Sequence, residues 1–297
     1  INSGISWIEQ VSGTSQWLDK VQFINSLNGW VIGEGKTLLK TTNGGNTWIS
    51  LTGPNLSWYS DIFFIDINIG WLVGSDGNIF NTNNGGANWN QQISSTTNDL
   101  SSVFFINNTT GWIVGKNGII LKTTNGGSNW DICNSNTTEN LYSVFFPSSL
   151  NGYTVGNNGT IISSIDGGNN WTEQNSPTSQ WLSSVFFSDN LTGWAVGGAN
   201  WSNDLSSTIL KTNDGGNSWV FQSVGNYNDL NAVFFVNNNF GWIVGDSYFL
   251  RTDNGGTTGL NDLSNKLVLD ISVFPNPADC NFSISAKSKE FSLANIS

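Results

Sequence analysis

An internal repeat of 41 residues constrains the fold of this chain more than any other feature. A Gly followed by an aromatic residue recurs six times, from Gly29-Trp30 to Gly241-Trp242, and Gly-Gly pairs recur in the same register. The pairs begin at Gly44, Gly85, Gly126, Gly167, Gly215 and Gly255. Two independent markers with one spacing exclude coincidence. The single longer step, 48 residues, places a seven-residue insertion after Gly197.

Each repeat is expected to form four short strands. In the third unit, runs rich in β-branched and aromatic residues at 102–106, 112–114, 119–122 and 129–132 are separated by Asn- and Gly-rich turns. Four antiparallel strands in about 41 residues are typical of a propeller blade. Consecutive apolar residues such as Phe104-Phe105 favour a sheet buried on both faces. The sequence therefore predicts an all-β, six-bladed β-propeller.

The two ends of the repeat indicate how the ring closes. The sixth unit has Gly259 where the other units have Trp, so its fourth strand is missing. Residues 5–9 are similar to the fourth strand at 46–50, and we expect this N-terminal strand to complete the last blade. Closure in this way removes two open sheet edges. A seventh blade would require additional chain.

Three segments are expected along the chain. Residues 1–258 form the propeller, residues 259–266 form a linker, and residues 267–297 form a short C-terminal β tail. The composition changes where the period stops, which supports a boundary there.

Composition excludes several classes of function. The chain of 297 residues has no His, so His-based triads and His-ligated zinc sites are impossible. Its net charge of -11 disfavours nucleic acid and anionic lipid as partners. No run approaches the roughly 18–20 apolar residues of a membrane helix, so no membrane insertion is expected. Cys133 and Cys280 make no disulfide framework and are expected to be free, and no cofactor is expected.

A second motif, Ser/Thr-x-Asp/Asn-x-Gly-x-x-Trp, occurs in each of the first five units, and the sixth lacks only the Trp. The third position of this motif is occupied by Asn43, Asn84, Asn125, Asp166, Asp214 and Asn254. A short acceptor side chain at this position caps a tight turn, while Gly supplies positive φ and Trp packs inward. Because Asn is a poorer metal ligand than Asp, we expect a structural role for these boxes and no bound metal.

The motif resembles the Asp box (BNR repeat) of sialidase-like, sortilin-like and photosystem II assembly-factor propellers. The whole unit is most similar to the Ycf48-type subgroup, and the resemblance covers residues 5–258. Sialidases of this group clamp their substrate with three arginines, whereas this chain has only Arg251, so sialidase activity is excluded. Xyloglucanase-type relatives join two larger propellers. In the Ycf48 family, the assembly role depends on an arginine-rich patch that is absent here, so the resemblance does not imply a photosynthetic function.

The tryptophans outside the repeat positions define a candidate binding surface. Trp17, Trp58 and Trp181 share one register, just before the innermost strand of a blade, and Trp201 lies in the insertion. The complete set, with the residues at the same register in the other blades, is Trp17, Trp58, Asp99, Asn140, Trp181, Trp201 and Asp229. We expect these residues to surround the channel mouth on one face and to bind a glycan or a protein by stacking and hydrogen bonding. The alternative is that the indoles only cover the channel mouth.

The C-terminal segment carries a further motif. Residues 267–274 alternate like a strand and end in Phe274-Pro275-Asn276-Pro277. This pattern resembles the start of the type IX secretion C-terminal sorting domain of Bacteroidetes, although that domain is normally longer than the remaining chain. The resemblance implies the secretion machinery as a partner of the tail and an extracellular or outer cell-surface location. An ordinary two-proline loop on a terminal hairpin is the alternative.

Three functions remain open on these grounds. The expected one is a non-enzymatic, secreted or cell-surface propeller that binds a glycan or an extracellular protein through one face. The second is a structural or adhesive component that self-assembles. The third is a glycoside hydrolase or lyase with a carboxylate pair at the channel mouth, for which Asp99 and Asp229 are candidates.

Overall fold

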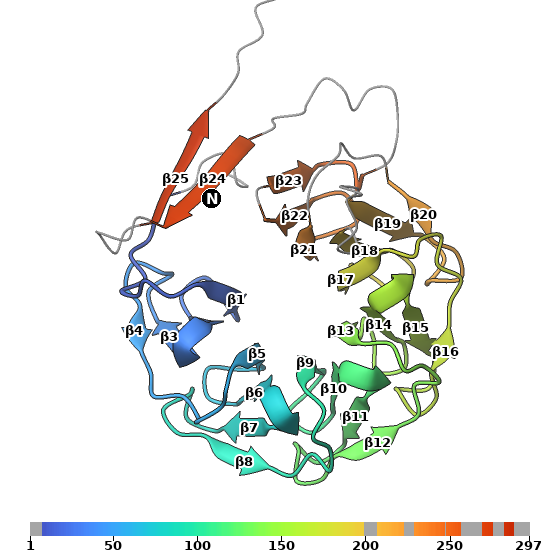
Figure 1. The fold of residues 1–297 in the computed structure, drawn as a ribbon, viewed down its shortest axis with the longest axis horizontal. Coiled ribbons are helices and arrows are strands. Elements are labelled where there is room, and N and C mark those ends of the chain that lie inside the picture. The colour runs from blue at the N-terminus through green and yellow to red at the C-terminus, as the bar shows by residue number, and fades with distance from the viewer. Residues whose placement is uncertain are drawn as a thin grey trace, which may run out of the picture.

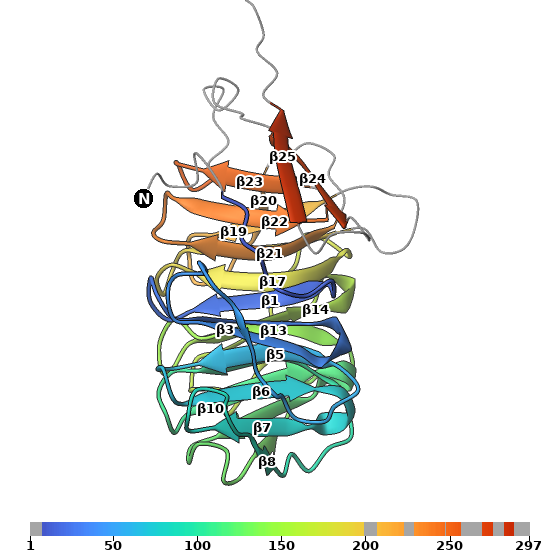
Figure 2. The same ribbon diagram turned by 90° about the vertical axis from the view of Figure 1, so that its left-hand side faces the viewer.

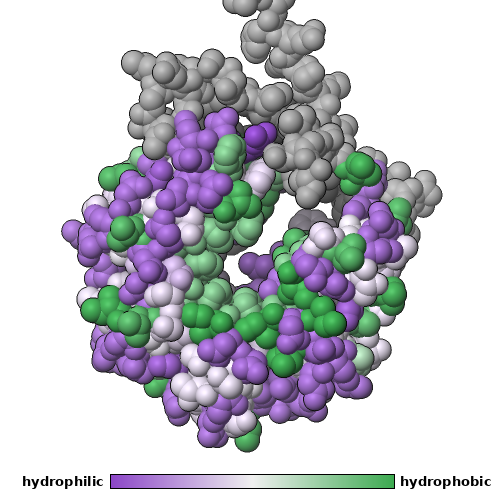
Figure 3. Space-filling view, turned by 180° about the vertical axis from the view of Figure 1, so that it is seen from behind, coloured by the Kyte–Doolittle hydropathy of each residue, from purple (hydrophilic) through white to green (hydrophobic). Residues whose placement is uncertain are grey.

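The computed structural model confirms an all-β, six-bladed propeller with a central channel (Figures 1 and 3). It describes residues 8–198, 207–222, 229–246, 248–256, 269–275 and 282–287. The only helices in these ranges are four single 3-10 turns, and none is long and apolar enough to cross a membrane. Five sheets have four antiparallel strands each, in chain order from the innermost strand outward.

The strands recur with the period of the sequence repeat. Blades 1 to 3 consist of β1 (Leu18–Phe23), β2 (Gly29–Gly33), β3 (Thr37–Thr41), β4 (Ile49–Ser50), β5 (Tyr59–Phe64), β6 (Gly70–Gly74), β7 (Ile79–Thr82), β8 (Asn90–Gln92), β9 (Leu100–Phe105), β10 (Gly111–Gly115), β11 (Ile120–Thr123) and β12 (Asp131–Cys133). Blades 4 to 6 consist of β13 (Leu141–Phe145), β14 (Gly152–Gly156), β15 (Ile161–Ser164), β16 (Thr172–Glu173), β17 (Trp181–Phe187), β18 (Gly193–Gly198), β19 (Thr208–Thr212), β20 (Val220–Phe221), β21 (Leu230–Phe235), β22 (Gly241–Gly245) and β23 (Tyr248–Thr252).

The ring has two different faces. Every innermost strand begins at one face, which also carries the 3-10 turns between second and third strands, so we call it the turn face (Figures 1 and 2). These turns are η1 (Glu34–Lys36), η2 (Ser75–Gly77), η3 (Lys116–Gly118) and η4 (Asn157–Gly159). The opposite face carries the boxes and the turns between first and second strands, and we call it the box face (Figure 3).

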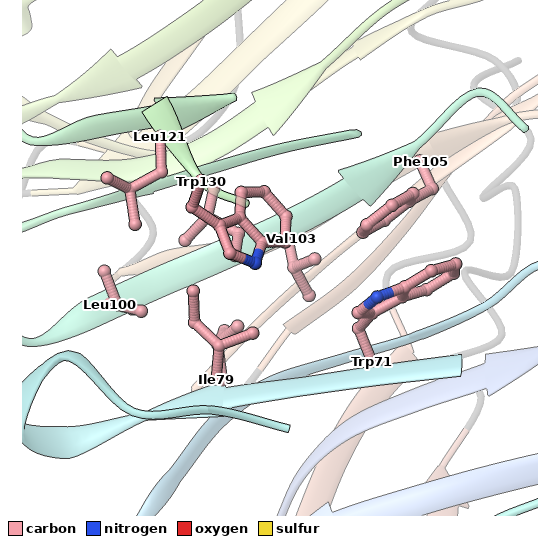
Figure 4. Packing of buried hydrophobic residues seen from close by; sticks show 9 residues of the cluster. Trp71, Ile79, Leu100, Val103, Phe105, Leu121 and Trp130 are labelled. Atoms are coloured by element: carbon pink, nitrogen blue, oxygen red, sulfur yellow. The ribbon is translucent and has the colours of Figure 1, made fainter. Parts of the chain in front are cut away.

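Neighbouring blades are joined by a repeated aromatic device. Between blades 2 and 3, Trp71 stacks on Phe105 with ring centroids 3.4 Å apart, and its Nε1 donates to the carbonyl oxygen of Gly126 at 3.3 Å (Figure 4). The same stack recurs at four other interfaces, in the pairs Trp30–Phe64, Trp112–Phe146, Tyr153–Phe187 and Trp194–Phe235. The rings are almost fully buried, which explains why Gly-aromatic and Phe-Phe markers share one period.

The C-terminal tail extends the sixth sheet. Strand β24 (Leu269–Pro275) pairs with the outer edge of β23, and β25 (Phe282–Lys287) pairs with β24, giving the order β21-β22-β23-β24-β25. The sequence predicted that residues 5–9 would take the place beside β23, and the structure differs. Residues 5–7 lie outside the described residues, and Ile8 and Glu9 are not in a strand. The free N–H and C=O groups of β23 are paired by the tail instead.

The described N-terminal residues nevertheless occupy a repeat position. Gln10 Nε2 donates to the carbonyl oxygen of Gly44, and Gln10 Oε1 accepts from Trp48 Nε1, both at 3.3 Å. Gln92, two repeat lengths further on in β8, makes the same pair of bonds to the third box. Gln10 therefore lies against blade 1 as the fourth strand of a preceding blade would. In this structure β24, and not an N-terminal strand, occupies the fourth position of the last blade.

Candidate functional site

The residue before each innermost strand is held at the turn face by its own backbone. The carbonyl oxygen of Asp99 accepts the N–H of Lys116, the first residue of η3, at 2.9 Å. Trp17 and Trp58 accept the corresponding N–H groups of η1 and η2 at 2.9 and 3.4 Å. This shared anchor fixes the backbone at the register identified in the sequence and leaves the side chain free to differ between blades.

In blades 3 and 4 this side chain joins two blades. Asp99 Oδ1 accepts the backbone N–H of Asp76, in the turn of blade 2, at 2.9 Å. Asn140 Oδ1 accepts the N–H of Asn117, in the turn of blade 3, at 3.0 Å. Both residues of the predicted binding set therefore satisfy neighbouring backbone donors, and a structural role follows from this geometry.

The Asp99 carboxylate also has a charged partner. Lys116 Nζ lies 2.5 Å from Asp99 Oδ2. Burial alone would raise the pKa of Asp99, but the hydrogen bond and charge of Lys116, together with the Asp76 N–H, hold the pKa below its usual value. A carboxyl group held ionised in this way is a poor general acid. Lys116 was missed from the sequence, because no register marker distinguishes it.

Blades 1 and 2 present indoles to solvent at the same register. The side chain of Trp17 is 65% exposed and that of Trp58 is 49% exposed. An exposed indole offers a flat apolar face for stacking on a sugar or a peptide side chain. The neighbouring blades have a short polar residue at this register that makes a structural hydrogen bond, whereas Trp17 and Trp58 are largely exposed. These two tryptophans are therefore the strongest candidates for ligand contact.

The remaining members of the set differ from these two. Trp181 is half-buried, edge-on to Tyr142 with ring centroids 5.9 Å apart, and its Nε1 makes no hydrogen bond within the described residues. Asp229 lies against Gly198, where a Cβ atom would come within 2.0 Å of Asp229 Oδ1. Trp201 lies outside the described residues. Of the seven predicted residues, Trp17 and Trp58 are exposed to solvent, whereas Asp99, Asn140 and Asp229 contact neighbouring groups of the chain. Trp181 packs against Tyr142.

The boxes on the opposite face are local turn structures. In the fourth box, Asp166 Oδ1 accepts from Ser164 Oγ and from the backbone N–H of Asn170, at 2.8 and 3.0 Å. In the first box, Asn43 Oδ1 accepts from Thr41 and Thr47 in the same way. No group of three or more Cys, Asp or Glu residues within the described ranges is arranged to hold a metal ion.

Two recesses on the described surface lie beside the turns between second and third strands. One is shallow and polar, at the rim of blade 2 beside Asp76, Gln91 and Ser94, and a second lies beside Asn158 and Glu173 of blade 4. Neither contains a residue of the predicted set. Cys133 is a free, half-buried thiol, and burial raises its pKa, whereas Cys280 lies outside the described residues.

A second aromatic set was missed from the sequence. Each innermost strand of blades 2 to 6 carries a Phe-Phe pair near its box-face end. The second Phe of each pair makes the interface stack, and the side chain of the first Phe is partly exposed. These residues are Phe63, Phe104, Phe145, Phe186 and Phe234. The Phe-Phe pairs recur in the sequence with the repeat period. A sheet buried on both faces accounts for both residues of each pair, so the sequence did not distinguish the exposed Phe from the buried one.

Comparison with known proteins was made at three levels. A family model described as photosynthesis system II assembly factor YCF48 matches residues 50–138, 129–200 and 169–270. No curated protein matches the chain significantly. Among solved structures, one titled "YCF48 bound to D1 peptide" has a TM-score of 0.66 and 20% identity, and the match covers 90% of this chain and 87% of that chain.

Two further solved structures extend the comparison. YCF48 from Cyanidioschyzon merolae has a TM-score of 0.55 and 18% identity, with 80% of this chain and 96% of that chain covered. The GH74 enzyme of Niastella koreensis has a TM-score of 0.67 and 14% identity, and the match covers 82% of this chain but only 46% of that chain. These likenesses establish a common fold. Because the family model spans residues 50–270, well over half of the sequence, the chain belongs to the YCF48 family of BNR-repeat propellers.

Proposed function

We propose that this protein is a non-enzymatic, secreted or cell-surface propeller that binds an extracellular protein or a glycan through its turn face. The exposure of Trp17 and Trp58 at the channel-side register carries the proposal. Where that register is not used for binding, Asp99 and Asn140 satisfy backbone donors of the neighbouring blade. A large apolar side chain exposed at such a position costs hydration free energy and is consistent with a partner.

A protein partner is favoured over a glycan by one comparison. The solved structure of a YCF48 protein is titled as bound to a D1 peptide, so a propeller of this family takes a peptide. With a single arginine, this chain does not offer the arginine-rich patch of that family. We therefore propose a different peptide or glycan ligand that is recognised by indole stacking.

The test is a binding screen with a matched control. Wild-type protein and the double variant Trp17→Ala/Trp58→Ala are applied to a glycan array and to an array of random 12-residue peptides. The control is Phe221→Ala, which removes an aromatic side chain of similar exposure from the outer strand β20. We expect the double variant to lose at least tenfold in affinity for the best array ligand while the control does not. Equal affinity of all three proteins for every array ligand contradicts the proposal.

Secretion through the tail is part of the proposal. Phe274 and Pro275 end β24, whereas Asn276 and Pro277 lie outside the described residues. A strand followed by this motif supports a sorting signal read by the type IX machinery. Deletion of residues 267–297 in a type IX-competent host is expected to retain the protein in the periplasm, and unchanged release to the medium contradicts this part.

A hydrolase is the second candidate, because GH74 enzymes have the same blade architecture. The chain spans less than half of each of those enzymes, and the match covers 38% of an ancestral GH74 enzyme. Turnover of xyloglucan that disappears in Asp99→Asn or Asp229→Asn would establish this candidate. Because Lys116 lowers the pKa of Asp99, that carboxylate would act as the base or nucleophile, and Asp229 would have to supply the proton.

A further inference from the structure

The five partly exposed phenylalanines form a continuous aromatic arc along the inner edge of the blades. Consecutive ring centroids are 5.3 Å apart for Phe63–Phe104, 5.2 Å for Phe104–Phe145, 4.9 Å for Phe145–Phe186 and 5.2 Å for Phe186–Phe234. The rings are tilted relative to one another by between 44° and 59°. Each ring therefore touches the next across a blade boundary, and we call the set the phenylalanine arc.

The arc lies at the margin of the core, where Phe63, Phe104, Phe145 and Phe186 pack against buried clusters but keep part of their surface exposed. The phenylalanine that follows each arc residue is stacked on an indole or, for Phe187, on Tyr153 of the neighbouring blade, and is only 1 to 3% exposed. The arc residues are half-buried, and Phe234, at the end of the arc, is 54% exposed. The fold does not require an aromatic residue here, because blade 1 has Gln22 at the same register. Gln22 Oε1 accepts the N–H of Phe64 at 2.6 Å, and Gln22 Nε2 donates to the Phe64 carbonyl oxygen at 3.0 Å.

Apolar side chains continue from the arc onto the box face. The turns between first and second strands expose several aliphatic residues by about half or more of their surface, namely Leu27, Ile67, Leu150, Leu191 and Val236. In the space-filling view of this face, hydrophobic residues gather around the opening of the channel (Figure 3). Contiguous exposed apolar surface of this kind marks interaction sites.

The charge around this opening is negative. The turns that surround it, at 24–28, 65–69, 106–110, 147–151, 188–192 and 236–240, contain Asp66 and Asp189 and no Lys or Arg. The nearby lysines of the third strands point to the boxes, where Lys40 donates to the Gly85 carbonyl and Lys211 to the Gly255 carbonyl, at 3.2 and 2.8 Å. The chain as a whole carries -11. A partner with positive charge is therefore complementary to the rim.

We infer that the box-face mouth of the channel is a second binding site, which takes a peptide segment with an aromatic or long aliphatic side chain flanked by basic residues. The apolar side chain enters the channel and packs on the phenylalanine arc, as aromatic anchors do in buried interface pockets. The flanking Lys or Arg residues lie over the rim near Asp66 and Asp189. This site is on the opposite face from Trp17 and Trp58, so it is independent of the proposed function.

The test uses the full chain and a defined peptide array. The array contains 12-residue peptides with one central Trp, Phe or Leu between two Lys pairs, together with versions in which the central residue is Ala or the lysines are Glu. Wild-type protein is expected to bind the aromatic, basic peptides at least tenfold more tightly than either altered series. Absence of this difference overturns the inference.

Two variants locate the binding. Phe145→Gln/Phe186→Gln installs the residue that blade 1 already has at this register, and is expected to lower the affinity at least tenfold. Val236→Lys adds a cation at a rim position that is 59% exposed, where it does not perturb the core, and is expected to lower the affinity at least fivefold. The control is Phe221→Ala, which removes an exposed aromatic side chain from the outer strand β20, away from both proposed sites, and is expected to bind as wild type does.

A direct map of the contact completes the test. A peptide with a central benzoylphenylalanine is expected to photo-cross-link to residues in 145–151 or 186–192 on the box face. Cross-links confined to 17–18 or 58–59, on the turn face, overturn the inference. Binding of palmitate or of array glycans, in place of the basic peptides, that is lost in the Phe145→Gln/Phe186→Gln variant likewise overturns the assignment of a peptide.

Discussion

The five interfaces within the run of blades differ from the sixth, where blade 6 faces blade 1. In each of the five, an aromatic residue of the second strand stacks on a Phe of the next blade and donates to a box glycine carbonyl, as Trp112 does to Gly167 at 3.2 Å. At the sixth, the corresponding pair is Trp242 and Phe23. Phe23 is 43% exposed, and Trp242 Nε1 makes no hydrogen bond within the described residues.

The difference shows which part of the repeat holds blades together. Blade 1 has the same strands as the other blades, but Val21 and Phe23 on its open side are 64% and 43% exposed. The Gly126 carbonyl accepts from both Trp71 and Gln92, whereas among the described residues the Gly44 carbonyl accepts from Gln10 but not from Trp242. Packing between blades therefore depends on the stacked aromatic pair and on the hydrogen bond to the box glycine carbonyl. Without them, the complete four-stranded sheet of blade 1 leaves one face exposed to solvent.

The largest effect is expected for an interior interface. Trp112→Ala removes a fully buried indole, its stack on Phe146 and the donor to the Gly167 carbonyl. Loss of a buried Trp costs about 3–5 kcal/mol of unfolding free energy. Urea denaturation followed by circular dichroism measures this loss. A decrease below about 1 kcal/mol, within the range of ordinary surface substitutions, contradicts the role of the device.

The same substitution at the sixth interface is the matched control. Trp242 is half-buried and has no stacking partner among the described residues, so Trp242→Ala is expected to cost about 1 kcal/mol, an average effect for a point mutant. Phe23→Ala should cost equally little. If either variant loses as much as Trp112→Ala, the sixth interface is closed in solution by the same stack.

How far the sequence predicts this architecture follows from the same contrast. Trp30 and the Gly85 carbonyl are 55 residues apart, so the repeat itself specifies each interior interface. Trp242 and Phe23 carry the same markers, and the sequence therefore predicts six equal interfaces. Their meeting depends on the accumulated curvature of all blades, and on which segment pairs with β23, and neither quantity is encoded in one repeat.

The candidate site was predicted in part for a similar reason. The register of Trp17, Trp58 and Asp99 before the innermost strand follows from the period, and the structure places all three at the turn face. The side-chain environments depend on contacts between blades. The bond from the Asp76 N–H to Asp99 and the packing of Trp181 on Tyr142 could not be inferred from spacing alone.

A smaller difference in unfolding free energy is expected between variants of two glutamines, Gln92 in β8 and Gln10 in the N-terminal segment. Each contacts the box of the next blade from a fourth-strand position. Gln92 is half-buried and bonds both Gly126 and Trp130, whereas Gln10 makes the same contacts at the exposed edge of blade 1. Gln92→Ala is expected to lower the unfolding free energy by about 1–2 kcal/mol through the lost bonds. Gln10→Ala should cost about 0.5 kcal/mol, as exposed substitutions do. Urea denaturation distinguishes the two, and equal losses would show that the N-terminal segment is as firmly seated as β8.

The smallest effect concerns the residue that caps the box receiving Trp112. Hydrogen bonds from the backbone and side-chain N–H groups of Asn170, with the Ser164 hydroxyl, lower the pKa of Asp166 to about 2. An unfolded Asp has a pKa of about 3.9, so the folded state binds the proton more weakly. The resulting stabilisation is complete above about pH 4 and is lost as the pH falls through about 2.

Asp166→Asn should therefore flatten the pH dependence of the unfolding free energy between about pH 4 and pH 2, with little change at pH 7. Asn125→Asp, in the neighbouring box, is the reciprocal variant and should steepen that dependence. Thermal unfolding across this pH range measures both slopes, and unchanged slopes would show that the cap contributes nothing to the acid response.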